Sequence, residues 1–460
     1  AAGTAVLLVA ESHFFKAFGP AMAVTILVGL LISITLVPAL IGILGPRIFF
    51  PRRDPRLLPE PTGSTASSGV ETQASAHSMW LAKLLVQPPA AWAATIVCVT
   101  LLIIASLPLF SVRLDADFSG ALPDDNSVSQ ANAAASAGFA PGITSPTTLL
   151  VEGAGVARRQ SALIELQKVI AEQPGVAGVI GPRQSFPQLP NLMLAKTGDA
   201  ARMLVVLDHT PLGAQAIDDL SRLRDDLPGL AAQVGLADYR FSFTGDTALA
   251  EGLVKGTFAD LGRIALAGII VNFAILAIFL RALVAPFFLL LSSVLALSAS
   301  LGLTTWMFID VLGEEGLTFY VPFAAAVLLV SLGSDYNIFG VGRVWELART
   351  TPLRQAIAVA MPETSRAITT AGLALAVSFG MLAVIPVTSF RELAFAMGVG
   401  ILIDAFVVRS VMVPAMLTLL GLSSAWPNKR LLRHDRILRE EERAAAAYSE
   451  SRLRGLWRAR

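Results

Sequence analysis

The stretch SLGSDYNIFGVGR, residues 331–343, places a carboxylate inside an apolar run that begins near Val321. A helix needs about 20 consecutive apolar residues to cross a bilayer, and the segment VPFAAAVLLV just upstream has no charge. We therefore expect a membrane-spanning helix over about Val321 to Val341, with Asp335 at about mid-depth. A carboxylate there costs roughly 3 kcal/mol on insertion scales, so its presence indicates a function, and a structural Asp bonded to nearby hydroxyls is the alternative.

Further apolar blocks lie on both sides of this run. Hydrophobic residues make up 54% of the chain and charged residues 15%, whereas an average soluble domain has about 25% charged residues. A globule of this size cannot bury so much apolar surface, and this composition is typical of an integral membrane protein. We expect spans over about Ala17 to Leu44, Ala90 to Phe110, Gly262 to Leu280, Val284 to Ile309, Val321 to Val341, Ala367 to Pro386 and Leu393 to Leu420.

Two polar segments separate the first spans from the others. Residues 46 to 89 contain PRRDPR and GSTASSG, a composition typical of a flexible linker. Residues 111 to 260 carry 17 Asp and Glu against 11 Lys and Arg. In this acidic segment the short apolar runs TTLLVE, GVAGVI, RMLVVLD and RFSFTG alternate with helical patterns over about Val156 to Glu172 and Gly213 to Gln233. The order is βαββαβ, the split βαβ motif, so we expect an α+β domain outside the membrane.

Lys and Arg in the short loops predict the orientation. If every apolar block crosses once, one face carries Arg47, Arg52, Arg53, Arg56, Arg281, Arg343, Arg349, Arg354, Lys429, Arg430 and Arg433. That face should be cytoplasmic, and the acidic domain should be extracytoplasmic. The expected organisation is the last spans of a first half (1–45, one partial and one complete), a cytoplasmic linker (46–89), a span (90–110), the extracytoplasmic domain (111–260), five spans of a second half (261–421) and a basic cytoplasmic tail (422–460).

The expected span over about Ala17 to Leu44 and the last span, over about Leu393 to Leu420, resemble each other. At an offset of 376 residues, VPALIGILG (Val37 to Gly45) aligns with VPAMLTLLG (Val413 to Gly421). Secondary transporters are commonly built from duplicated halves. On this interpretation, we expect most of the first half to precede Ala1.

The last span also carries two charged residues, Asp404 and Arg409, in GILIDAFVVRSVMVP. Five residues of α-helix put them about 140° apart, so they need not face each other. The aligned positions in the span over Ala17 to Leu44 are Val28 and Ser33, so only the last span carries charged residues at these two positions. We expect Arg409 or Asp404 to set the electrostatics around Asp335. An ion pair that only fixes the helix register is the alternative.

Other chemistries lack their sequence motifs. The chain has no GxxxxGK[ST] phosphate loop, which excludes ATP hydrolysis by that route. The histidines, His13, His77, His209 and His434, are scattered without ligand spacing, so we expect no metal site. Cys98, the single cysteine, lies in an apolar block and cannot build a disulfide framework. We expect no enzymatic activity, no cofactor and no nucleic-acid partner.

The order of spans, the split βαβ domain, GSDYN in the fourth span of its half and GILIDAFVVRSVMVPA in the sixth resemble the MMPL family (mycobacterial membrane protein large) of the resistance-nodulation-division (RND) superfamily. The resemblance covers essentially the whole chain. It implies a polytopic α-helical membrane protein with an RND-like bundle and an extracytoplasmic porter-type domain. It also implies a secondary transporter, driven by the proton-motive force, that exports or flips lipids or other hydrophobic molecules. The family's proton relay would fall on Asp335 and Tyr336, with Asp404 and Arg409 in the last span.

Two other functions fit the same architecture. A sterol-sensing or receptor-like protein would bind a lipid without transport and would not need Asp335 to titrate. A scaffold protein of envelope synthesis would tolerate neutral residues at the charged positions. The expected partners are protons, membrane lipids and a lipid or hydrophobic substrate, and a homo-oligomer or accessory envelope proteins also fit. Frequent Ala and Arg are typical of a high-GC bacterium, so we expect a multi-pass protein of its plasma membrane.

Overall fold

Seven helices long and apolar enough to cross a membrane are present in the computed structural model, which describes residues 6–11, 13–45, 82, 84–117, 125–184 and 192–428. The predicted polytopic α-helical membrane fold is therefore confirmed. Most of the expected linker and the tail from residue 429 lie outside the described residues. The spans are Gly19–Leu44, Pro88–Ser111, Asp246–Leu280, Val284–Val311, Val321–Leu347, Leu353–Val384 and Thr388–Ala425.

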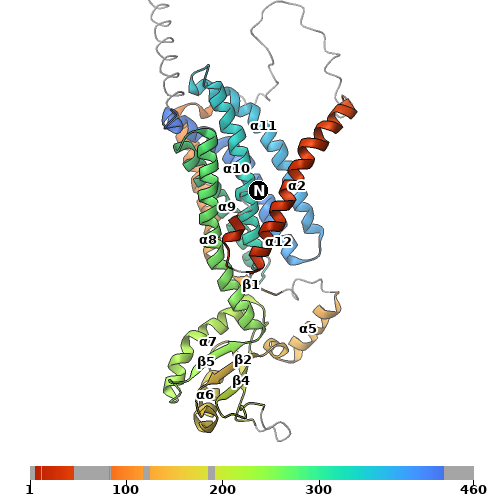
Figure 1. Ribbon diagram of the computed structural model, residues 1–460, viewed down its shortest axis with the longest axis vertical. Coiled ribbons are helices and arrows are strands. Elements are labelled where there is room, and N and C mark those ends of the chain that lie inside the picture. The colour runs from red at the N-terminus through yellow and green to blue at the C-terminus, as the bar shows by residue number, and fades with distance from the viewer. Residues whose placement is uncertain are drawn as a thin grey trace, which may run out of the picture.

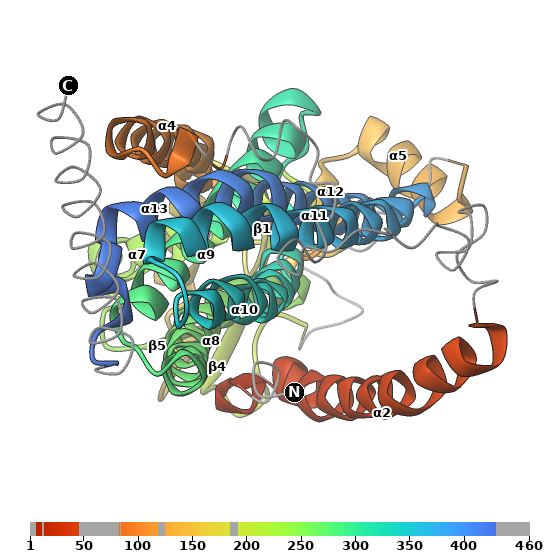
Figure 2. The ribbon, with the colours of Figure 1, turned by 90° about the horizontal axis from the view of Figure 1, so that it is seen from above.

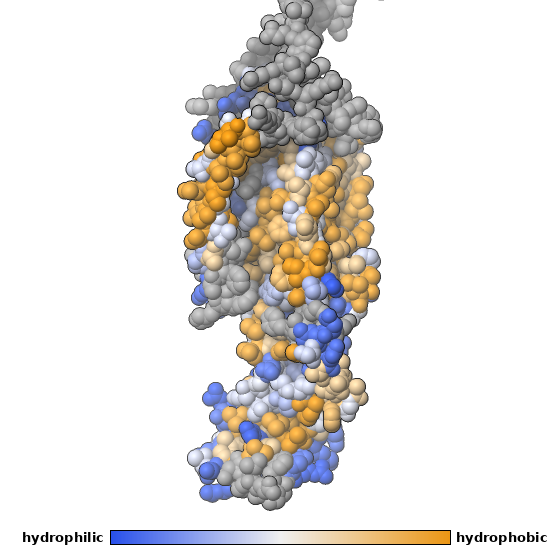
Figure 3. Space-filling view, turned by 90° about the vertical axis from the view of Figure 1, so that its right-hand side faces the viewer, coloured by the Kyte–Doolittle hydropathy of each residue, from blue (hydrophilic) through white to orange (hydrophobic). Residues whose placement is uncertain are grey.

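Most spans pack into one bundle around α9, which contacts α4, α8, α10 and the last span (Figures 1 and 2). Small and branched apolar side chains fill the contacts between them, among them Ala296 and Ala299 of α9. Large apolar side chains such as Ile278 and Phe287 are exposed, and Figure 3 shows apolar residues over much of one face of the bundle. An apolar exterior suits lipid rather than water. The bundle helices are α4 (Pro88–Ser106), α8 (Asp246–Leu280), α9 (Val284–Thr305), α10 (Val321–Leu347), α11 (Leu353–Gly380), α12 (Thr388–Leu402), η9 (Ile403–Met412) and α13 (Val413–Leu420).

The span expected over about Ala17 to Leu44 is helix α2 (His13–Leu44), which stands apart from this bundle (Figures 1 and 2). None of its most apolar window is buried. Its end matches the end of the last span: Gly45 and Gly421, which the repeat aligns, both have positive φ angles, 52° and 53°. Glycine favours this conformation because it has no Cβ. The two aligned glycines thus share this backbone angle.

The porter-type domain has the predicted βαββαβ order, with β2 (Thr147–Glu152), α6 (Gln160–Ala171), β3 (Val176–Ile180), β4 (Ala200–Leu207), α7 (Ala214–Gln233) and β5 (Arg240–Thr244). Its sheet has the order β3-β4-β2-β5, and every pair is antiparallel. Alternate residues of β2, including Leu149, point into a core with Leu163 and Leu220 of the helices. One further helix, α5 (Ser127–Gly138), was not predicted, and none of its residues is buried.

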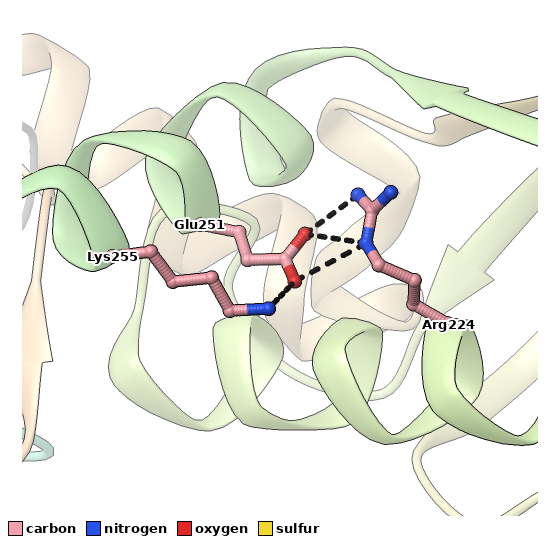
Figure 4. A network of polar contacts seen from close by, with 3 residues as sticks. All are labelled: Arg224, Glu251 and Lys255. Atoms are coloured by element: carbon pink, nitrogen blue, oxygen red, sulfur yellow. Dashed lines mark hydrogen bonds and ion pairs between the residues drawn. The ribbon is translucent and has the colours of Figure 1, made fainter.

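The domain and the bundle are joined through α8, which begins at Asp246 rather than at about Gly262 and runs without a break into the membrane (Figure 1). Near its start Glu251 is buried and pairs with Arg224 of α7 and Lys255, at 2.7 Å each (Figure 4). These contacts fasten the first turns of α8 to the porter-type domain. A short parallel pair of β1 (Leu114–Asp115) with β6 (Leu317–Thr318) makes a second connection beside it.

Candidate functional site

The last span is α-helical in α12 and α13 and π-helical between them, in η9. The i→i+5 hydrogen bonds of a π-helix place residues five apart on the same face. Asp404 and Arg409 are five apart, and Arg409 Nε donates to Asp404 Oδ2 at 3.1 Å. The expectation that the two need not face each other assumed α-helical winding and is wrong for this reason.

Arg409 also reaches the neighbouring helix α10. Its guanidinium donates to the backbone oxygen of Gly333 and to Oδ1 of Asn337, and its side chain is 3% exposed. A buried cation is tolerated when a carboxylate and further acceptors surround it, and the planar fork of Arg suits several acceptors at once. Arg409 therefore fastens the last span to α10 at the level of the GSDYN motif.

Gly333 and Asn337 were not predicted as partners of Arg409. They flank Asp335 in the sequence, and Asn337 is 1% exposed. Within the part of the chain that the structure describes, Nδ2 of Asn337 has no hydrogen-bond acceptor. Leaving a buried donor unpaired costs about 1–3 kcal/mol. The only sequence signal for Asn337 is its place two residues after Asp335.

The four predicted site residues come from two neighbouring helices. The backbone of Asp335 belongs to α10, between the two residues that Arg409 contacts, and its side chain lies outside the described part of the structure. Tyr336 lines two small cavities, one of about 20 Å³ that it shares with Asp404 and one of about 10 Å³ that it shares with Arg409. The structure thus brings Tyr336, Asp404 and Arg409 together.

The larger of these cavities has room for one water, which requires about 10–15 Å³. Ser293 of α9 and Gly400 of α12 also line it. A Cβ added at Gly333 would lie 3.4 Å from Arg409 Nη2 and 3.6 Å from Ser293 Oγ. Both distances are ordinary van der Waals contacts, so α9, α10 and the last span meet at Gly333 without requiring glycine there. A polar site of this kind inside a membrane bundle, with ionisable groups around a small cavity, is typical of proton and ion pathways.

The sequence of this chain is similar to those of known membrane proteins. The sequence profile of the MMPL family matches residues 1–91 and 120–458. The membrane protein ActII-3 of Streptomyces coelicolor is 32% identical over 443 residues, which cover 94% of this chain and 55% of ActII-3. The apo-petrobactin exporter of Bacillus anthracis is 25% identical over 441 residues, covering 93% of this chain and 56% of the exporter. The acyltrehalose exporter MmpL10 of Mycobacterium tuberculosis is 32% identical over 262 residues, covering 56% of this chain and 26% of MmpL10.

The chain spans about half the length of the curated relatives that it matches along most of its sequence. The profile match includes both GSDYN and IDAFVVR, the segments whose residues meet at Arg409. The helical bundle, the βαββαβ domain and the profile match lead to one conclusion. The chain belongs to the MMPL family of the RND superfamily and is a multi-pass protein of the plasma membrane.

Proposed function

We propose that this protein is a secondary transporter, driven by the proton-motive force, that exports or flips lipids or other hydrophobic molecules across the plasma membrane. The observation that carries the proposal is the buried site of Asp404, Arg409 and Tyr336 beside the backbone of Asp335. Two relatives named as exporters, of apo-petrobactin and of acyltrehalose, support export. The activity is a movement of molecules, not an enzymatic reaction.

In this mechanism Asp335 takes up and releases the proton, and Tyr336 is its neighbour in the relay. Arg409 bonds to Gly333 and Asn337, two positions before and two positions after Asp335 on α10. In this proposal a change of charge at Asp335 is transmitted through α10 to the guanidinium that joins it to the last span. A proton that crosses the membrane gains about 2.3 kcal/mol per 100 mV. That energy is enough to shift an equilibrium between two conformations that differ by a few kcal/mol.

Movement of the bundle would reach the porter-type domain through α8. This helix is continuous from Asp246 to Leu280, and Glu251 ties its first turns to α7. We place the porter-type domain on the extracytoplasmic side, as the distribution of Lys and Arg predicts. A hydrophobic substrate would then be released on the extracytoplasmic side of the membrane.

The test is Asp335→Asn in the full-length protein. Asn keeps the shape of Asp and can form hydrogen bonds, but it does not release a proton near neutral pH. We expect Asp335→Asn to abolish substrate movement in reconstituted vesicles under an imposed pH gradient, without lowering the thermal stability of the purified protein. Tyr336→Phe should have an equal or a milder effect.

The matched control is Asp238→Asn, at an exposed position of the porter-type domain, which should leave transport unchanged. Gradient-driven transport by Asp335→Asn at the wild-type rate would remove Asp335 from the mechanism. It would favour a lipid-sensing protein without transport.

A further inference from the structure

A buried carboxyl group that the candidate site does not use lies near the start of α12. Glu392 is 1% exposed, and Thr318 N of β6 donates to its Oε2 at 3.0 Å. Across the described ranges of the chain, Glu392 forms no ion pair. Burying a charged carboxylate without a cation costs several kcal/mol, so a membrane protein that keeps Glu at this position gains something other than stability from it.

Glu392 lines a cavity of about 200 Å³ between the porter-type domain and the bundle. Four other carboxyl groups line the same cavity, from β1, the turn after it and the loop before β6: Asp115, Asp117, Glu314 and Glu315. We call this space the vestibule. The nearby His209 acts electrostatically on Glu315 and bonds to Asp219 at 2.7 Å.

Proton exchange near neutral pH is available in the vestibule. Burial, together with the nearby carboxylate of Asp117, raises the pKa of Asp115 to about 7. Burial also raises the pKa of Glu315, although the charge of His209 opposes the shift. Asp115 therefore changes its proton content within the pH range in which a plasma membrane works.

A stripe along α12 connects the vestibule to the candidate site. Glu392, Ala396 and Gly400 of α12 and Asp404 at the start of η9 are spaced four residues apart, so each residue of the series is the neighbour of the next on the helix surface. The two carboxyl groups at its ends are 12 residues apart, about 18 Å along the axis. The two positions between them carry the smallest side chains, so groups of the neighbouring helices can approach the backbone of α12 there.

The group that approaches the middle of this stripe is a hydroxyl of α9. Ser300 is fully buried, and its Oγ donates to the backbone oxygen of Ala396 at 2.6 Å. A Cβ added at Gly400 would lie 2.5 Å from a methyl carbon of Leu329 and 2.9 Å from the same Oγ. Ser300 is therefore halfway between Glu392 and Asp404 and touches the stripe at two positions.

Two further hydroxyl groups of α9 extend the line. Thr304 follows Ser300 by one helical turn and is fully buried, and Ser293 precedes it by two turns and lines the 20 Å³ cavity beside Asp404. The three residues share a face of α9, because their spacings of four and seven residues are close to whole turns. Two turns span about 10 Å, so water molecules must complete the line, and the cavity at Ser293 has room for one.

We propose that protons reach the relay from the porter side through Glu392 and this line of hydroxyl groups. Glu392 accepts a proton from the water of the vestibule. The proton then passes along waters held by Ser300 and Ser293 to the cavity between Asp404 and Tyr336, and Glu392 is left ionised for the next cycle. Only O–H bonds form and break. The inference rests on the proposed function, because it supplies protons to the relay at Asp335.

The test uses the full-length protein in vesicles and measures substrate movement while the pH on the porter side is varied and the pH on the other side is fixed. We expect Glu392→Gln to slow transport about tenfold or more and to abolish its dependence on porter-side pH. Gln can still accept the hydrogen bond from Thr318, so thermal stability should not fall. Glu392→Asp, which keeps a carboxyl group, should restore the pH dependence.

Two matched variants separate the route from local charge and from folding. Asp238→Asn removes a carboxylate at an exposed position of the porter-type domain that does not line the vestibule and should keep the wild-type pH response. Ser300→Ala removes one hydroxyl and should slow transport. A wild-type rate and pH response in Glu392→Gln, or in Ser300→Ala, overturns the route. If Asp335→Asn is inactive in the same vesicles, only the route fails; if Asp335→Asn transports under the gradient, the proposed function fails.

Discussion

Arg409 has three contacts that a single substitution would remove together: the carboxylate of Asp404, the amide oxygen of Asn337 and the backbone oxygen of Gly333. Arg409→Met keeps most of the bulk and leaves Asp404, whose side chain is 14% exposed, without its cation. Breaking a buried pair in this way costs about 3–5 kcal/mol. We therefore expect Arg409→Met to lose transport and to unfold at a lower temperature than the wild type.

A second substitution separates these two effects. Arg409→Met combined with Asp404→Leu removes both charges, so the double variant should regain much of the lost stability, which thermal unfolding measures as a non-additive change. It should still fail to transport, because no guanidinium remains to join the last span to Gly333 and Asn337 of α10. Recovery of transport in the double variant would reduce the pair to a structural contact that fixes the helix register.

Sequence reasoning could identify the charged residues of the site, since charges stand out within apolar spans. It could not identify Asn337 and Gly333 as the partners of Arg409, because neutral polar and small residues are common in membrane helices. It also missed Glu392, whose neighbours in SFRELAF make it look like an ordinary residue at the end of a span. The contact of Asp404 with Arg409 depends on a π-helix, and the periodicity of the sequence carries no sign of one.

Among the elements, helices were predicted best where bilayer thickness decides their length. The apolar blocks locate each span, but α8 and α11 begin well before them, at Asp246 and Leu353. These extensions leave the apolar core and are held by side-chain contacts such as that of Glu251 with Arg224. Helix α5, rich in Ala and Ser, has no apolar face that would reveal it. Hydropathy thus predicts the helix segments that cross the lipid, and it misses the helix segments outside the lipid, such as the first turns of α8, that polar contacts hold.

The packing of α4 on α9 makes a sharp prediction at Gly302. A Cβ added there would lie 2.8 Å from Cα of Ser106 and closer still to the backbone oxygen of Ala105. Both atoms belong to the backbone and cannot rotate away. We expect Gly302→Ala to push the helices apart and to cost about 1–3 kcal/mol, seen as a lower midpoint of thermal unfolding of the protein in detergent.

The matched control is Gly268→Ala in α8, where an added Cβ meets nothing within 4 Å. There the better helix propensity of Ala, worth up to about 1 kcal/mol, should leave stability equal or slightly higher. If both substitutions have the same effect, close approach of the backbones is not what Gly302 provides.

For the whole molecule, the connections between the porter-type domain and the bundle gather at one end of the spans. The tie of Glu251 to α7, the pairing of β1 with β6 and the vestibule all lie there. A proton taken up at Glu392 would therefore change the charge next to β6, since Thr318 N bonds to Glu392. Proton uptake and movement of the porter-type domain would be coupled at the same place.

This coupling requires that the porter-type domain face the extracytoplasmic side, where protons enter under the proton-motive force. The prediction is tested in a Cys98→Ala background with single cysteines introduced by Ser161→Cys, on an exposed face of α6, and by Thr350→Cys, in the exposed turn between α10 and α11. We expect an impermeant thiol reagent to label the Ser161→Cys protein in intact cells and the Thr350→Cys protein only after lysis. Ser67→Cys, in the expected linker, should behave like Thr350→Cys.

The opposite pattern would place the acidic domain in the cytoplasm. Glu392 would then face the side to which protons are delivered, so it would release protons rather than take them up. The pH on the porter side would then affect the release of protons rather than their uptake. The loop Arg residues that predict the orientation would lie outside the cell. Labelling of both variants in intact cells would instead show that the reagent had entered the cells. The control is a cytosolic protein in the same cells, which stays unlabelled if the reagent has not entered.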